Sequence, residues 1–191
     1  GKMYRAVTLY FLQNNIEYAD QAIVELALPS INIHFEKINN TDTTFLNGRN
    51  VESEIISMPV AQHVSPVATI PAVRRAMVAQ QQKMGLHKGI IMDGRDIGTV
   101  VFKEAELKIF LTASEAVRTQ RRYDELLSKG KNVDKETIRQ NLTQRDHIDS
   151  NRADSPLLQA DDAVLIDNSN LSKTEKLAMI KTLALERIKK N

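Results

Sequence analysis

The residues from Gly89 to Phe102, GIIMDGRDIGTVVF, hold one cation and two carboxylates at a spacing that suits phosphate chemistry. The apolar run Ile90 to Met92 predicts a short strand, and Asp93, Arg95 and Asp96 follow it directly. Ligands of open α/β sheets bind at the carboxyl ends of the strands, and a guanidinium offers a rigid fork of donors that matches phosphate oxygens. Taken alone, these residues are explained equally well by a charged turn in which aspartate and arginine pair with each other.

A second set of candidate residues consists of three arginines with helical spacing. Arg121 and Arg122 follow Arg118 by three and four positions, so the three residues lie on one face of a helix. Like charges on one helix face repel each other by a few tenths of a kcal/mol per pair, and an anionic ligand would offset this. Considered alone, the face is better explained as a solvated surface on which neighbouring acidic side chains neutralise the arginines.

A third set lies in the segment Gln144 to Arg152. Arg145 and Asp149 are one helical turn apart, and Arg152 follows one turn later. A ladder of surface ion pairs explains this spacing too. However, residues 128–133 join the two arginine-bearing helices, which predicts a helical hairpin that could close over a polyphosphate and exclude water.

Composition limits the classes of protein to consider. The chain has 191 residues, of which 42% are apolar and 26% charged, so it is long enough for one core with a small inserted lobe. A formal charge of +2 is too small to indicate nucleic-acid binding, and the absence of cysteine excludes disulfides and thiolate metal sites. No apolar run approaches the ~20 residues of a membrane span, so a cytoplasmic protein is expected.

The first half of the chain predicts helices on both sides of a β-rich segment. Apolar residues at positions 31, 33 and 35 alternate with polar ones, which is typical of a strand, and Asn47-Gly48 is a strong hairpin signal. Proline at position 71 favours the start of a helix. The expected elements are helices over residues 4–13, 17–27 and 71–84, and strands around residues 31–35, 43–46 and 49–51.

In the second half, strands alternate with helices, which predicts an α/β fold with a parallel sheet covered on both faces. Thr112 to Glu115 and Ser172 to Glu175 have the pattern of capping boxes, and Asp134 is expected to cap a further helix. The expected elements are strands over 90–92, 107–111 and 164–166, and helices from the first capping box toward Leu127 with an end at Gly130, from Asp134 to about His147, and from Ser172 onward with Leu177, Ile180, Leu183 and Ile188 facing inward.

Together these residues resemble one family, the bacterial cytidylate kinases, which belong to the nucleoside monophosphate kinases. The most specific match is DGRDIGTVVF at residues 93–102 combined with RDxxDxxR at residues 145–152. The resemblance covers nearly the whole chain in the right order. The other matching segments are Gly1-x-x-Tyr4-Arg5, Asn47-Gly48 with Val51, Ser65 in VSPVA, Pro71-x-Val73-Arg74, KIFLTAS from Lys108 to Ser114, Arg118-x-x-Arg121-Arg122, and Ser155-Pro156-Leu157.

The resemblance implies a P-loop NTPase-like parallel sheet covered by helices, with a small β-rich insert that binds the nucleoside monophosphate and a helical lid. On this basis residues 1–29 and 71–191 belong to the core, residues 30–70 form the insert, and the lid lies at about residues 118–152. The resemblance also implies a cytoplasmic monomer with small-molecule partners and no nucleic-acid or membrane partner.

The same resemblance implies phosphorylation of CMP and dCMP by ATP with Mg²⁺. Arg5 and Arg95 would hold the phosphate of the acceptor, and Tyr4 would lie beside them. The remaining roles would be recognition of cytosine by Ser65, Arg74 and Asp96, binding of the sugar and phosphate region by Asp149, Arg152 and Arg145, a further substrate contact by Asp93, and a lid over ATP formed by Arg118, Arg121 and Arg122. Arg95, Arg145 and the three lid arginines are the catalytic candidates, because phosphoryl transfer depends on positioning and charge neutralisation.

One motif of the family is absent from these 191 residues, namely the P-loop G-x-x-x-x-G-K-[ST], whose amides bind ATP phosphates and whose hydroxyl binds Mg²⁺. We therefore expect a segment upstream of Gly1 to supply it, expect the 191-residue chain alone to be inactive, and predict no metal ligand within it. Two alternatives stay open: a kinase for another nucleoside monophosphate or small metabolite, and a non-catalytic nucleotide-binding protein that has lost its P-loop.

Overall fold

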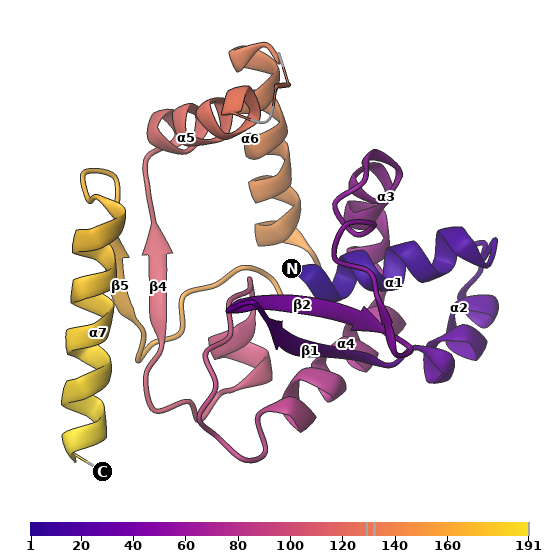
Figure 1. Ribbon diagram of the computed structural model, residues 1–191, viewed down its shortest axis with the longest axis horizontal. Coiled ribbons are helices and arrows are strands. Elements are labelled where there is room, and N and C mark those ends of the chain that lie inside the picture. Colours follow the sequence, from indigo (N-terminus) through magenta and orange to yellow (C-terminus); the bar gives the residue numbers. More distant parts are fainter. Residues whose placement is uncertain (129, 132, 191) are drawn as a thin grey trace. The chain divides into compact units, whose positions relative to one another are not determined.

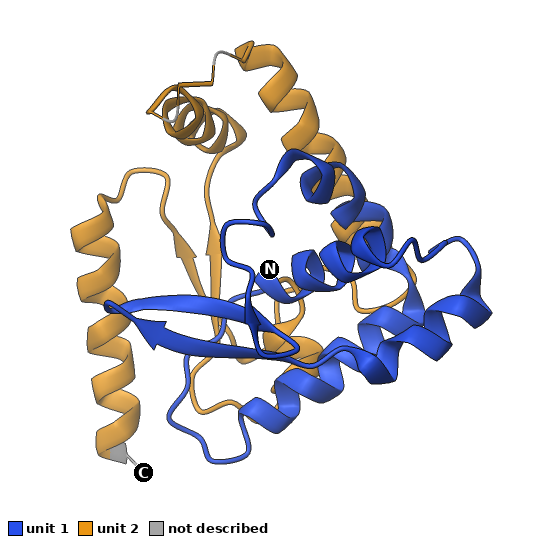
Figure 2. Ribbon diagram, turned by 45° about the vertical axis from the view of Figure 1, so that its right-hand side comes forward, with its two compact units in different colours: residues 1–94 blue, residues 95–191 orange. Residues whose placement is uncertain are grey.

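The computed structural model describes residues 1–128, 130–131 and 133–190. The chain divides into two compact units, Gly1–Gly94 and Arg95–Asn191, which we call unit 1 and unit 2 (Figures 1 and 2). Unit 1 holds an antiparallel sheet and unit 2 a parallel pair of strands, each with helices. The expected fold class, α/β with a parallel sheet, is confirmed. The expected division into residues 1–29, 30–70 and 71–191 stays a prediction.

Unit 1 is built from helices around a hairpin. The turn at Asn47-Gly48 and the helix start at Pro71 lie at the predicted positions, whereas α2 begins at Gln21 instead of residue 17 and β1 spans Ile33–Ile38 instead of residues 31–35. Asn47 and Gly48 have φ angles of 49° and 80°, the left-handed values that the tight turn between two strands requires. Asp20 caps the second helix by accepting from the backbone N–H groups of Ala22 and Ile23. The elements are α1 (Lys2–Gln13), α2 (Gln21–Ala27), a 3-10 turn (Leu28–Ser30), β1 (Ile33–Ile38), β2 (Thr41–Leu46), β3 (Arg49–Asn50), α3 (Met58–Thr69) and α4 (Pro71–Met84).

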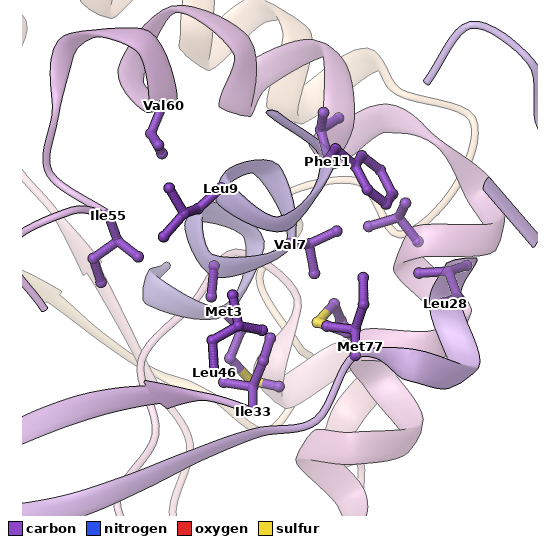
Figure 3. Packing of buried hydrophobic residues seen from close by; sticks show 14 of the residues in the cluster. Met3, Val7, Leu9, Phe11, Leu28, Ile33, Leu46, Ile55, Val60 and Met77 are labelled. Carbon is purple, nitrogen blue, oxygen red and sulfur yellow. The ribbon is translucent and has the colours of Figure 1, made fainter. Parts of the chain in front are cut away.

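The core of unit 1 forms where α1 meets α3, α4 and the hairpin (Figure 3). Alternation along β1 and β2 sends Ile33 and Leu46, which are paired across the two strands, into this core. α1 contributes Val7 and Phe11, and α4 contributes Met77, all almost completely buried. Because α1 is covered by several elements, its first turn, which carries Tyr4 and Arg5, is held on a fixed support.

Unit 2 contains the parallel pair, and α7 lies beside these strands in both views (Figures 1 and 2). Ile109 pairs with Val164 and Thr112 with Asp167. The capping box at Ser172 is confirmed, because the Ser172 hydroxyl accepts from the Glu175 N–H and the Glu175 carboxylate accepts from the Ser172 N–H. The elements are a π-helical turn (Ile97–Val101), β4 (Ile109–Thr112), α5 (Glu115–Ser128), α6 (Lys135–Asn151), β5 (Val164–Asp167) and α7 (Lys173–Lys190).

The strand predicted for Ile90 to Met92 is wrong. These residues have no regular secondary structure, and Ile91 is fully exposed. A strand exists only through hydrogen bonds to a neighbour, and among the described residues β4 and β5 pair only with each other.

Three smaller expectations differ from the structure. The helix α3 was not predicted; Pro59 falls in its first turn, where no N–H is needed, and Pro66 lies inside the helix. Ser114, not Thr112, provides the side-chain acceptor at the start of α5, for the N–H of Val117. In α7, Leu177 and Ile188 are exposed instead of facing inward, whereas Ile180 and Leu183 are half-buried.

Candidate active site

In unit 2, the carboxylate of Asp149 gathers three arginines around it. Its Oδ2 lies 3.0 Å from Nε of Arg95 and 3.8 Å from Nε of Arg145, and its Oδ1 lies 3.3 Å from Nη1 of Arg152. Asp149 and Arg152 are mostly buried, whereas Arg95 and Arg145 are partly exposed. Three guanidinium groups on one carboxylate leave an excess of positive charge, which suits an anionic ligand.

Local structure explains why these side chains meet. Asp149 lies in the last turn of α6 and Arg152 caps its end, and the backbone N–H of Leu157 donates to the carbonyl of Asp149 at 2.7 Å. The guanidinium of Arg152 also donates to the carbonyl of Ser155 at 2.6 Å, which ties the connection after α6 to the helix end. Arg95 is the first residue of unit 2 and lies two positions before the π-helical turn.

The pKa of Arg145 is shifted by its burial and by the charges of the neighbouring side chains. Loss of solvent around its guanidinium lowers that pKa from its ordinary value, and the positive charge of Arg95 lowers it further, against the opposing effects of Asp149 and Asp146. A negative ligand would relieve the repulsion between Arg95 and Arg145. Desolvation is the larger cause of the lowered pKa, and repulsion from Arg95 is the second.

The structure does not bring the three arginines of α5 to one place. Arg118 reaches α6, where it contacts the carboxylate of Asp146, and also donates to the carbonyl of Ala113. Arg122 pairs with Glu125 on its own helix at 2.7 Å, as the reading of a solvated face expected. Arg121 donates to Asn168 and to the carbonyl of Leu171. Of the three, Arg118 alone has a described ion pair with α6, the helix carrying Asp149; a second ion pair between the two helices joins Glu115 of α5 to Arg139 of α6 at 3.0 Å.

In unit 1, two of the candidate residues contact each other. The guanidinium carbon of Arg74, on α4, lies 5.5 Å from the ring centre of Tyr4, on α1, within the range of a cation–π interaction. Arg74 is buried and donates to the carbonyl of Ala68 at the end of α3. Arg5 donates to the carbonyl of Ile55 at 3.0 Å, and Ser65 is exposed on α3.

The two aspartates of the DGRD segment differ. Asp93 is exposed in a part of unit 1 without regular structure. Asp96 is buried, and its backbone carbonyl accepts from the N–H groups of Val100 and Val101, which forms the π-helical turn. The buried carboxylate is the better placed of the two to keep a fixed orientation.

Sequence reasoning missed two acidic residues in these networks. Asp146 faces Arg118 across the helical hairpin, although it stands next to Arg145 within the motif RDxxDxxR. Glu52 accepts from the backbone N–H and hydroxyl of Thr44, and its other oxygen lies 2.6 Å from Nζ of Lys2. Neither partner could be found from spacing, because each lies far away in the sequence.

Comparison with known proteins gives a consistent result. The model of the family described as cytidylate kinase matches residues 1–186. A cytidylate kinase of Phocaeicola vulgatus is 55% identical over 181 residues, which cover 92% of this chain and 79% of the relative. One of Bacteroides fragilis is 53% identical over 181 residues with the same coverage. One of Flavobacterium johnsoniae is 50% identical over an aligned length of 197 positions, gaps included, which covers 99% of this chain and 84% of the relative. The chain, with its arginine cluster on Asp149, belongs to the cytidylate kinase family.

Proposed function

We propose that the protein transfers the γ-phosphoryl group of ATP to CMP and dCMP, giving CDP and dCDP. The observation that carries the proposal is the set of three arginines on Asp149, because it joins the DGRD segment to the RDxxDxxR motif. Phosphoryl transfer places charge on the moving phosphoryl group and on both flanking oxygens, so fixed cations lower the barrier. The names of the curated relatives favour cytidine nucleotides over the two alternatives.

Each unit contributes its own set of binding groups to this proposal. In unit 1, Arg5 would bind the acceptor phosphate beside Tyr4, and Ser65 and Arg74 would bind the cytosine edge. In unit 2, Arg95 and Arg145 would bind phosphate oxygens, and Asp149 with Arg152 would bind the sugar. The remaining proposed roles are a contact of Asp96 with cytosine, a contact of Asp93 with substrate, and contacts of Arg118, Arg121 and Arg122 with ATP.

Mg²⁺ would enter together with ATP, because this ion usually binds nucleotide phosphates and few protein groups. In the described part of the chain, no three histidine or acidic side chains gather as they would have to in order to hold a metal by themselves. When bound, the ion neutralises charge on the phosphates of ATP. The arginines supply the positive charge that this chain itself contributes.

The remaining proposals concern the setting of the enzyme. None of the described helices is long and apolar enough to cross a membrane. We propose a monomer that works in the cytoplasm and has nucleotides, not nucleic acids, as partners.

Two measurements test the proposed function. Calorimetric titration of the 191-residue chain with CMP, dCMP, UMP and AMP should show binding of CMP and dCMP, with AMP at least about tenfold weaker, because polar groups that match cytosine stay unpaired against adenine. Conversion of CMP to CDP by ATP is measured on the protein expressed from its complete gene. Equal binding of AMP, or conversion of AMP in preference to CMP, would contradict the proposal.

A further inference from the structure

The segment Val51 to Ile56 connects the hairpin to α3 and is held against the first turn of α1. Val51 and Ile55 are completely buried, and the backbone N–H of Ile55 donates to the carbonyl of Val51 at 3.0 Å. Two neighbouring side chains of α1 reach this segment: Arg5 donates to the carbonyl of Ile55, and Lys2 pairs with the carboxylate of Glu52. Because Lys2 and Arg5 are three positions apart, they lie on the same face of α1.

Glu52 is the centre of a small network. One of its oxygens accepts from Thr44 on β2, at 2.9 Å from the backbone N–H and 2.7 Å from the hydroxyl. The other lies 2.6 Å from Nζ of Lys2. The same ammonium group donates to the backbone carbonyl of Asp42 at 2.7 Å. Lys2 therefore ties α1 both to the β2 strand and to the segment that carries Ile55.

A role in overall stability explains this network poorly. The side chains of Lys2 and Glu52 are 40% and 32% exposed, and ion pairs at such exposure contribute little to folding. The core of unit 1 is already held by buried apolar residues. What the network fixes is position: it sets where the segment lies against α1, and hence where the Ile55 carbonyl meets Arg5.

We propose that Lys2 is a positioning residue for the acceptor site, which acts through Glu52 and residues 51–56 to orient the guanidinium of Arg5. This inference rests on the proposed function, in which Arg5 binds the phosphate of CMP. Lys2 itself is not proposed to touch the substrate. The geometry of Arg5 would then depend on an ion pair whose two members lie fifty positions apart in the sequence.

The test measures CMP affinity by calorimetry in Lys2→Met, Glu52→Gln and the double variant. Each single change should weaken the binding of CMP by about five- to tenfold, because a small displacement of a phosphate-binding group weakens its interaction with the ligand strongly. The double variant should bind CMP no more weakly than either single variant, since both changes break the same ion pair between Lys2 and Glu52. Lys2→Arg, which keeps the charge and can reach Glu52, should stay within about twofold of wild type.

Two controls separate positioning from a general loss of structure. Lys37→Met removes an exposed lysine on β1 and should change neither CMP affinity nor melting temperature. In the Arg5→Ala background, Lys2→Met should cause no further loss of CMP affinity, because the group that it orients is gone.

A measurement made without nucleotide tests whether Lys2 orients Arg5, independently of the proposed function. The Nε–Hε resonance of Arg5 in ¹H–¹⁵N spectra, assigned by its loss in Arg5→Ala, should broaden or shift in Lys2→Met and be restored in Lys2→Arg. A wild-type chain that fails to bind CMP would contradict the proposed function, and this resonance would still decide whether Lys2 orients Arg5. An unchanged resonance in Lys2→Met, or a loss of affinity that persists in the Arg5→Ala background, would overturn the proposal.

Discussion

At the scale of single residues, Arg95 has an ion-pair partner and a proposed ligand that compete for the same guanidinium. Its Nε lies 3.0 Å from Oδ2 of Asp149, which lies outside the DGRD segment and is not the partner that the charged-turn reading gave it. The competing readings are an arginine that only balances Asp149 and an arginine that binds phosphate. The two readings predict different results for lysine at this position. Lysine keeps the charge but loses the planar pair of donors.

We expect Arg95→Lys to lower kcat/KM for CMP by about a hundredfold, because misplacement of the acceptor by about 1 Å has that effect. The melting temperature should hardly change, since a partly exposed ion pair contributes less than about 1 kcal/mol. Steady-state kinetics on the protein expressed from its complete gene, together with thermal unfolding, measure both. Arg49→Lys is the matched control, because Arg49 also pairs with a carboxylate, Glu54, at 2.7 Å. Near-normal kinetics in Arg95→Lys would remove this residue from the phosphate site.

The pKa of Glu52 gives a second prediction at this scale. Partial burial by itself would raise that pKa, but hydrogen bonds from Lys2 and Thr44 outweigh it, so the pKa lies below its ordinary value of 4.5. A carboxylate with a lowered pKa in the folded state contributes stability that is fully present above its unfolded pKa and is lost as pH falls through the folded one.

The free energy of unfolding should therefore differ between wild type and Lys2→Met by an amount that is constant near about pH 7 and shrinks toward about pH 3. Urea unfolding of both proteins across this range measures the difference. Glu52→Gln should show no such dependence on Lys2 at any pH. A difference that grows on acidification would show that the Lys2 and Glu52 pair is not what lowers this pKa.

Prediction from sequence succeeded at this scale where spacing was local. Arg145 and Asp149 lie one turn apart on α6 and Arg152 is the residue that follows this helix, so their proximity could be predicted. The contact of Arg95 with the same carboxylate was not predicted: the resemblance implied only that both residues bind the substrate, and fifty-four positions separate them. Long-range partners such as Lys2 with Glu52 depend on tertiary packing, which no local pattern encodes.

At the scale of elements, helix ends were predicted better than strands. Caps depend on one or two side chains next to the helix, so Asp134 and Ser172 could be identified from sequence. Strands depend on a neighbour, so the apolar run Ile90 to Met92 was assigned to a sheet that the described residues do not form there. The exposed Leu177 and Ile188 show the same limit, because a period of 3.6 identifies a helix face without showing what covers it.

The cap of α6 gives the prediction at this scale. Asp134 accepts from the backbone N–H of Thr137 at 2.9 Å and from its hydroxyl at 3.2 Å. Asp134→Ala should destabilise the protein by about 1 kcal/mol, measured by urea unfolding, because a helix N–H loses its acceptor. Asp134→Asn, which keeps an acceptor oxygen, should remain close to wild type. If asparagine costs as much as alanine, charge and not capping is the source of the effect.

At the scale of the whole molecule, the buried apolar residues are unevenly divided. The core cluster of seventeen residues runs from Met3 to Met77 and lies entirely within unit 1. In the described part of unit 2, Val101, Ile138 and Ile166 are the buried apolar residues. Since burial of apolar surface is the main favourable contribution to folding, the two units should differ in their ability to fold alone.

We expect residues 1–94, expressed alone, to fold and to unfold in one cooperative transition, because every member of that cluster is present. Residues 95–190, expressed alone, should unfold over a broad range, since three buried side chains do not supply a cooperative core. Circular dichroism during urea unfolding and the dispersion of amide resonances measure both. Met77→Ala, which removes a completely buried side chain from the cluster, should cost residues 1–94 about 2–5 kcal/mol and shift their transition to lower urea. A non-cooperative transition in residues 1–94, or an equally sharp one in residues 95–190, would show that the cluster does not determine where folding is cooperative.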